Sequence, residues 1–160
     1  MPEQIKVLFS ILFISTFIYS QDVAPTVANP IADITANEDT SNTTIDLTSV
    51  FTDIDNDDSA ITKAVQSNSN SSLVSASISG NTLTLDYESN QNGSATITVR
   101  GTSNGLTVDD EFTVTVNAVD DSPTVSSAIS DQTVNEDASN TTIDLSSVFT
   151  DIDNDDSAIT

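Results

Sequence analysis

The chain has 160 residues, with 25 Asp and Glu against 3 Lys and Arg, a formal net charge of -22, and neither His nor Cys. The lack of His and Cys excludes a Ser-His-Asp triad, a Cys nucleophile, a zinc site of the usual kind and disulfide bonds. The negative charge excludes nucleic acid and anionic membranes as partners held by charge, and it favours cations bound through oxygen ligands.

The first predicted element is a signal peptide at residues 1–21. A charge-free apolar run at residues 7–19 follows a short leader that carries Lys6. This run is shorter than the ~20 apolar residues of a membrane-spanning helix and matches the apolar part of a signal peptide, with the small Ser20 before the cut. The alternative is a buried strand or helix of the folded domain. We expect a secreted or cell-surface protein without direct membrane insertion after signal removal.

Alternating apolar residues predict about seven strands before residue 120. The strands are expected at residues 27–35, 43–47, 61–66, 73–78, 82–87, 94–100 and 112–119. Gly80 marks one turn, and Asn104-Gly105 is the strongest hairpin signal. Residues 47–51 are expected to form an irregular turn that places Val50 and Phe51 in the core. The pattern predicts an all-β, antiparallel Greek-key β-sandwich, and the lack of Cys and Trp disfavours an antibody-type domain.

The domain organisation follows from an internal repeat. Residues 22–62 align without a gap with residues 120–160, at an offset of 98, and 31 of the 41 positions are identical. We expect one repeat at residues 22–119 and an incomplete second repeat at residues 120–160. A period of this length suits independently folded domains in a tandem array better than a solenoid.

Acidic clusters return with the repeat. They are Asn37-Glu38-Asp39, residues 53–58 and Asp120-Asp121, and Asp86-Tyr87-Glu88 occurs once. Alternate Asp residues in a tight loop can turn several carboxylates toward one point, which is repulsive unless a cation lies among them. An EF-hand loop is excluded, because Asp58 replaces the required Gly and Ala64 the required Glu. The alternative is that these are ordinary turn residues on a soluble acidic surface.

Several motifs together resemble bacterial cadherin-like repeats, which are tandem domains of large secreted or surface proteins. The resemblance covers residues 22–160 and is carried by Asn37-Glu38-Asp39, Phe51-Thr52-Asp53-Ile54-Asp55, Asn92-Gly93 and Val119-Asp120-Asp121-Ser122-Pro123. It implies a Greek-key β-sandwich and a role in adhesion or in extended stalks. It also implies calcium as a cofactor at the junction between repeats.

The resemblance implies a set of metal ligands at this junction. They are Glu38, Asp86, Glu88, Asp120, Asp121, Asp151 and Asp153. The chain departs from the cadherin pattern where Asn117 replaces Asp, Val119 replaces Asn, and Tyr87 replaces the Arg of a Leu-Asp-Arg-Glu motif. These departures imply fewer than three bound ions.

We therefore predict a non-catalytic structural or adhesion module. Its partners are expected to be adjacent repeats of the same chain, and other cell-surface proteins or polysaccharide. One alternative is a carbohydrate- or surface-polymer-binding module, which the 5% aromatic content and the lack of Trp disfavour. Another is an acidic spacer without metal. An enzyme is disfavoured, because paired carboxylates that recur in the next repeat suit a scaffold better than one active site.

Overall fold

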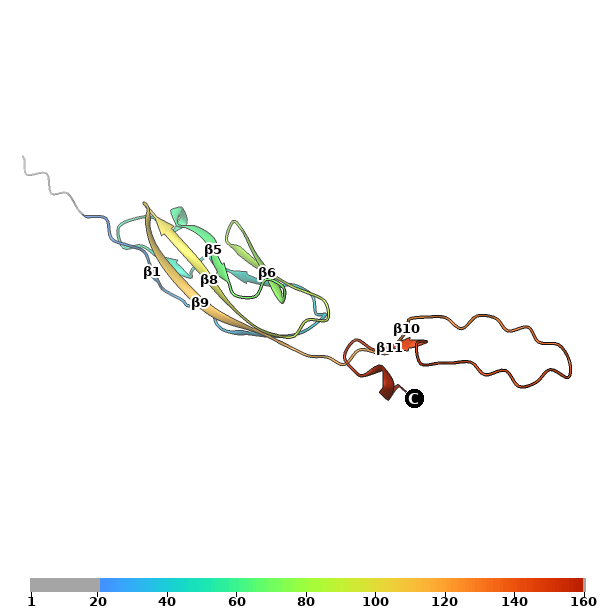
Figure 1. The fold of residues 1–160 in the computed structure, drawn as a ribbon. Helices are drawn as coiled ribbons and strands as arrows, with labels where there is room; N and C mark the ends of the chain where they lie inside the picture. The colour runs from blue at the N-terminus through green and yellow to red at the C-terminus, as the bar shows by residue number, and fades with distance from the viewer. Residues whose placement is uncertain (1–20, 160) are drawn as a thin grey trace, which may run out of the picture.

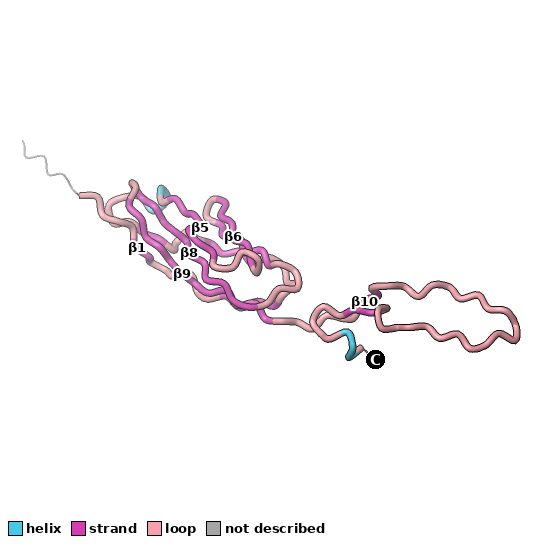
Figure 2. Tube along the Cα trace, viewed as in Figure 1, coloured by secondary structure: helices cyan, strands magenta, loops and turns pink. Residues whose placement is uncertain are grey.

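A computed structural model describes residues 21–159, so the predicted signal peptide lies outside the described residues except for Gln21. Two β-sheets dominate the fold (Figures 1 and 2). The elements before residue 120 are β1 (Thr26–Val27), β2 (Ile34–Asn37), β3 (Thr43–Asp46), β4 (Phe51–Thr52), the short 3₁₀ helix η1 (Asp58–Ala60), β5 (Thr62–Asn68), β6 (Val74–Ser79), β7 (Thr82–Tyr87), β8 (Gly93–Ser103) and β9 (Leu106–Asn117).

The two sheets form an immunoglobulin-like β-sandwich, which confirms the predicted fold class. One sheet has the strand order β2-β9-β8-β5, the other has the order β3-β7-β6, and β1 pairs with β4. All pairs are antiparallel except β2 with β9, which run parallel with Ile34 opposite Val114. The strand predicted at residues 27–35 is divided into β1, which pairs with β4, and β2, which pairs with β9. Pro30, which has no N–H for a strand ladder, lies between β1 and β2.

The core lies between the two sheets and uses the alternating positions that the sequence indicated. Leu83, Leu85, Ile97, Val99 and Val114 are all fully buried. The irregular turn at residues 47–51 is confirmed, because Val50 donates to the carbonyl of Leu47 and both Val50 and Phe51 join the core. The Phe51 ring at the end of this turn packs against Gly101 of β8.

The β8–β9 hairpin is longer than the sequence pattern suggested. Its turn residues Asn104 and Gly105 have φ values of 46° and 83°, the geometry that favours Asn-Gly in a two-residue hairpin turn. The start of β9 was missed because Asp109, Asp110 and Glu111 interrupt the apolar alternation. Asp110 nevertheless faces the interior, where its Oδ2 accepts a 2.7 Å hydrogen bond from the N–H of Ile31.

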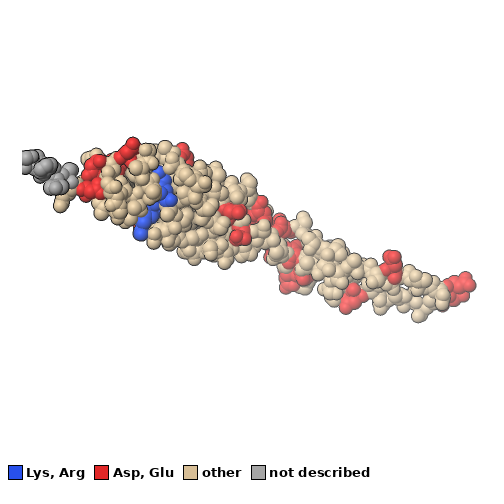
Figure 3. Space-filling model, turned by 90° about the horizontal axis from the view of Figure 1, so that it is seen from above, with Lys and Arg blue, Asp and Glu red and all other residues tan. Residues whose placement is uncertain are grey.

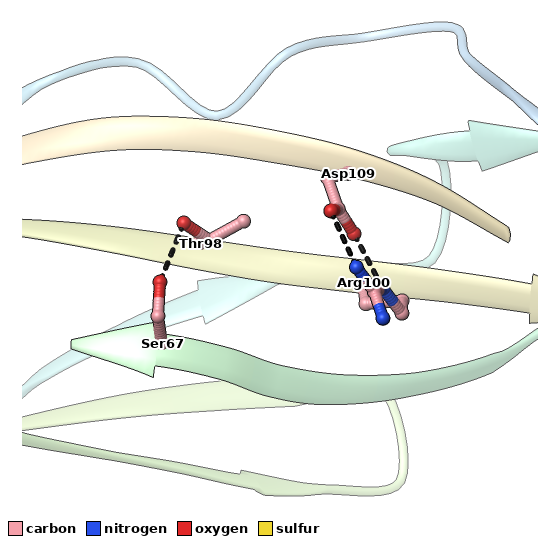
Figure 4. Close-up of polar contacts among 4 residues, drawn as sticks. All are labelled: Ser67, Thr98, Arg100 and Asp109. Carbon is pink, nitrogen blue, oxygen red and sulfur yellow. Dashed lines mark hydrogen bonds and ion pairs between the residues drawn. The ribbon is translucent and has the colours of Figure 1, made fainter.

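The outer face of the four-stranded sheet is polar. Arg100 on β8 makes two hydrogen bonds of 2.7 Å to Asp109 on β9, and the Ser67 hydroxyl donates to Thr98 at 2.8 Å (Figure 4). These contacts lie on the side of β8 opposite the core residues Ile97 and Val99. The outer face therefore needs no covering layer.

Residues 120–159, here called the C-terminal segment, repeat the local structure of residues 22–61 only in part, because the counterparts of β2 and β3 do not form strands. They contain β10 (Thr124–Val125), β11 (Phe149–Thr150) and the 3₁₀ helix η2 (Asp156–Ala158), with β10 and β11 paired in the register of β1 and β4. Phe149 is 40% exposed, whereas its counterpart Phe51 is 1% exposed. The difference arises because the C-terminal segment has no equivalent of β7–β9 to pack against it.

No helix among residues 21–159 is long and apolar enough to cross a membrane.

Candidate metal centre

Glu38 is the most unusual acidic residue at the end of the sandwich that faces the C-terminal segment. It follows β2, donates its N–H to the carbonyl of Asn117 at 3.0 Å, and is only 3% exposed. Its Oε1 accepts a 2.7 Å hydrogen bond from the N–H of Val119, but its buried Oε2 has no hydrogen-bond partner. A buried carboxylate oxygen without a partner is costly, and a cation would offset that cost.

Asp121 brings the C-terminal segment into the same acidic group. Its N–H donates to Oδ2 of Asp153 at 2.7 Å. Burial raises the pKa of the Asp121 carboxyl above its usual value, and four neighbouring charges raise it further, those of Asp39, Asp153, Glu38 and Asp151. Each of these four charges therefore repels that of Asp121. The five carboxylates are here called the junction group. Acidic atoms gather where the sandwich meets the C-terminal segment (Figure 3).

The remaining predicted ligands differ in their relation to the junction group. Asp120 is linked to Asp151 of the group through Asn154. Its Oδ1 accepts a 2.7 Å hydrogen bond from Nδ2 of Asn154, and the N–H of Asn154 donates to Oδ1 of Asp151. Asp86 and Glu88 are exposed on and just after β7, and neither is among the charges that raise the pKa of Asp121. The structure thus brings together four of the seven predicted ligands, Glu38, Asp121, Asp151 and Asp153.

Asp39 belongs to the junction group but was not among the predicted ligands. It has a φ of 59°, which is rare for a residue other than Gly, and its Oδ1 accepts a hydrogen bond from the N–H of Asn90 at 3.1 Å. Asn90 in turn lines a surface hollow with Asp121 and Asp151. The signal in the sequence was the Asn37-Glu38-Asp39 cluster, but only the backbone turn shows where Asp39 lies.

Several other acidic residues have a structural role in their own loops. Asp58 accepts hydrogen bonds from the Thr52 hydroxyl and the Asp53 N–H, and Asp57 caps η1 through the Ser59 N–H. Asp155 and Asp156 do the same in the C-terminal segment. Hydrogen bonds lower the pKa of Asp57, chiefly the one from the Ser59 backbone. For these residues the turn interpretation is correct.

The junction group gathers several negative charges, but its carboxylate oxygens are not positioned to coordinate a metal ion. Within residues 21–159 no three acidic side chains lie close enough together to hold a metal ion as they stand. Calcium takes 6–8 oxygens in irregular geometry, including carbonyls and water, and flexible side chains can move toward it. Ion binding here therefore requires the exposed carboxylates of Asp39 and Asp153 to turn toward the half-buried Asp121.

Comparisons with known proteins give little beyond the fold. No family model and no curated protein matches the chain. Among solved structures, the endo-fucoidan hydrolase MfFcnA4 of glycoside hydrolase family 107 matches 60% of this chain and 14% of its own at 24% identity and a TM-score of 0.42. Titin M4 matches 61% of this chain and all of its own at 17% identity and a TM-score of 0.39. Such weak likenesses say nothing about what the chain binds or does.

Proposed function

We propose that the chain is a non-catalytic, cadherin-like structural or adhesion module of an exported bacterial protein, with calcium at the junction between repeats. In this proposal residues 22–119 are one repeat and residues 120–160 begin the next. Its partners are the adjacent repeats and, on the cell surface, other proteins or polysaccharide. The observation that carries the proposal is the unpartnered Oε2 of the buried Glu38.

The position of Glu38 links ion binding to the stiffness of the junction. Oε1 already holds the N–H of Val119, two residues before Asp121. An ion bound to Oε2 and to Asp121 would tie the end of β2 to the C-terminal segment through both oxygens of one side chain. It would also offset the burial and the neighbouring charges that together raise the pKa of Asp121. At a calcium concentration 100 times the Kd, binding would stabilise the folded state by about 2.7 kcal/mol.

A calcium titration of the full chain tests this proposal by two measurements. Calorimetry is expected to show a melting temperature that rises with calcium and saturates. Small-angle X-ray scattering is expected to show a narrower distribution of end-to-end distances once calcium is bound. Magnesium serves as the control, because it prefers strict octahedral geometry and keeps its water. An unchanged melting temperature at millimolar calcium would contradict the proposal.

An acidic spacer without metal is the second candidate. It is favoured by the hydrogen bonds that Asp57, Asp58, Asp155 and Asp156 make within their own loops, since turn formation alone explains those residues. This candidate predicts that sodium chloride and calcium chloride at equal ionic strength have the same effect on stability, because both would only screen the charges.

A further inference from the structure

The two main sheets of the sandwich have four edge strands, and β6 differs from the other three. The sheet orders β2-β9-β8-β5 and β3-β7-β6 place β2, β5, β3 and β6 at the edges. An edge strand exposes unpaired main-chain groups, and proteins protect it with charged residues, proline or irregular pairing. β3 contains Asp46, β5 contains Lys63 and a shift in its register with β8, and β2 is followed directly by Glu38. β6 has the sequence Val-Ser-Ala-Ser-Ile-Ser and pairs regularly with β7, so it has none of these features.

The pairing of β6 with β7 determines which main-chain groups of β6 face the open edge (Figure 1). A two-residue turn joins the two strands, with Ser79 opposite Thr82. Residues that flank such a turn exchange hydrogen bonds, and hydrogen-bonded residues then alternate along an antiparallel pair. The three serines of β6 therefore bond to β7. The N–H and C=O groups of Val74, Ala76 and Ile78 point away from β7, to the open edge.

The contacts of Val74 agree with this assignment. Its carbonyl accepts a 2.7 Å hydrogen bond from Nδ2 of Asn68, and its N–H donates to the carbonyl of Asn70 at 3.3 Å. Ala76 and Ile78 are left to offer their N–H and C=O groups to another strand. Both side chains are half-buried and pack against the core, so a strand added beside them would also cover apolar surface.

The charges around β6 favour a second copy of this chain as that partner. Residues 64–85 are the longest stretch of the chain without a charged side chain, although the formal net charge is -22. Two copies can therefore approach along β6 with less repulsion than along their acidic surfaces. Charges of opposite sign flank the strand. After β6, Nζ of Lys63 donates to Oδ1 of Asn81 at 2.9 Å. Before β6, the N–H of Glu88 donates to the carbonyl of Leu73 at 3.0 Å.

We propose that two copies of this chain pair through β6, in an antiparallel arrangement with twofold symmetry that joins their three-stranded sheets. One register uses all the free main-chain groups at the edge. In it, Ser77 lies opposite Ser77 of the second copy, and Ala76 of each copy lies opposite Ile78 of the other. These two residue pairs exchange hydrogen bonds in both directions, and the apolar side chains of both copies stay on the core side of the joined sheet.

The same register brings unlike charges together. It places Asn81 of one copy opposite Leu73 of the other, because each lies four residues from Ser77 along the strand. Glu88 is then two strand spacings, or about 10 Å, from Asn81 of the second copy, a distance that the long side chains of Glu88 and Lys63 span. Such pairs fix orientation and register more than they add affinity. The interface contains no residue of the junction group, so it does not rest on the proposed function.

Sedimentation equilibrium of the full chain without calcium measures this association. We expect a monomer–dimer equilibrium with a Kd of about 1 µM to 1 mM, because the interface is small. Ser77→Lys places two like charges opposite each other at the symmetry axis, and we expect it to weaken dimerisation at least about ten-fold. The matched control is Thr44→Lys, at an exposed position on the edge strand β3 of the same sheet. It changes the net charge equally and should not weaken dimerisation.

A cysteine cross-link tests the register, since the chain has no Cys of its own. Across the axis, Ser77 and its counterpart form a pair without hydrogen bonds, with Cα atoms about 4.5 Å apart, which a disulfide can bridge. Ser77→Cys is therefore expected to form a covalent dimer under mild oxidation, and the control Thr44→Cys is not. A chain that stays monomeric up to about 1 mM overturns the proposal and leaves the edge to a strand of another protein. Equal cross-linking at both positions also overturns it, because it indicates non-specific association.

Discussion

The carboxylate of Glu38 accepts a 2.7 Å hydrogen bond from the backbone N–H of Val119, 81 residues later in the chain. This contact ties the end of β2 to the segment that leaves β9. It uses only one of the two carboxylate oxygens and leaves Oε2 buried without a partner. The Glu38 side chain therefore binds the segment after β9 through Oε1 and leaves Oε2 as the strongest candidate ligand for an ion.

Glu38→Gln tests the role of this free oxygen. The amide can still accept the hydrogen bond from Val119 through its carbonyl oxygen, but it carries no charge for an ion. We expect the melting temperature without calcium to change little and the increase with calcium to disappear, as measured by calorimetry. The matched control is Glu136→Gln in the second copy of the motif. Glu136 is exposed, and this variant should keep the full calcium response.

Asp121→Asn tests the repulsion within the junction group. The pKa of Asp121 is raised, first by burial and then by four neighbouring carboxylates, so its ionised form costs stability at neutral pH. That cost is relieved as the pH falls through the raised pKa, and Asn relieves it at any pH. We expect a higher melting temperature without calcium and a smaller increase with calcium. Asp131→Asn, at an exposed position, should change neither value. A lower melting temperature for Asp121→Asn without calcium would contradict this account.

The pH dependence of stability tests the environment of Asp53. Its pKa is lowered from 3.8 to about 2, chiefly by Ser103. A lowered pKa contributes stability that is present above about pH 4 and is lost as the pH falls through about 2. Ser103→Ala should therefore be less stable than wild type at about pH 6, and the difference should vanish near pH 2. Urea unfolding at both pH values measures this, with the exposed Ser94→Ala on the same strand as control. A difference that persists at the lower pH would assign the effect to packing.

Asp110→Ala tests the interior hydrogen bond between β9 and Ile31, in the segment that connects β1 to β2. Oδ2 of the buried Asp110 accepts a 2.7 Å hydrogen bond from the Ile31 N–H, beside Pro30. Removing the acceptor leaves a buried donor unpaired, so we expect a loss of about 1–3 kcal/mol in the free energy of unfolding. Asp110→Asn, which keeps an acceptor oxygen, should lose less. Equal losses in urea denaturation would show that charge, and not the hydrogen bond, matters.

Gly101→Ala tests the packing of the irregular turn beneath β8. A Cβ at Gly101 would lie 2.8 Å from Cγ of Phe51, closer than real Cβ atoms approach, and 3.1 Å from both Cδ atoms, which is a tight contact. Because both groups are buried, we expect a loss of about 1–3 kcal/mol from overpacking. Phe51→Leu is itself destabilising, but it should reduce the cost of Gly101→Ala when the two are combined. Additive losses in this double-mutant cycle would contradict direct contact.

The sequence by itself determined the strands and the places where acidic residues gather. Alternating apolar side chains predict strands because only a pleated strand sends successive residues to opposite faces, and Asn104-Gly105 predicts its hairpin because both residues tolerate positive φ. The division of the first strand and its parallel pairing with β9 could not be predicted. They depend on where the chain crosses between sheets after Pro30 and on the distant Asp110 that holds Ile31.

Only the tertiary structure decided which acidic residues are buried and which are satisfied within their own loops. In the sequence, Asp53, Asp57 and Asp58 look alike, but Asp57 and Asp58 are satisfied by their own loop, whereas Asp53 is buried beside Ser103, 50 residues later. Glu38 is likewise buried by the segment around Asn117 and Val119. Burial and the loss of water partners come from packing between distant strands, which no local pattern records.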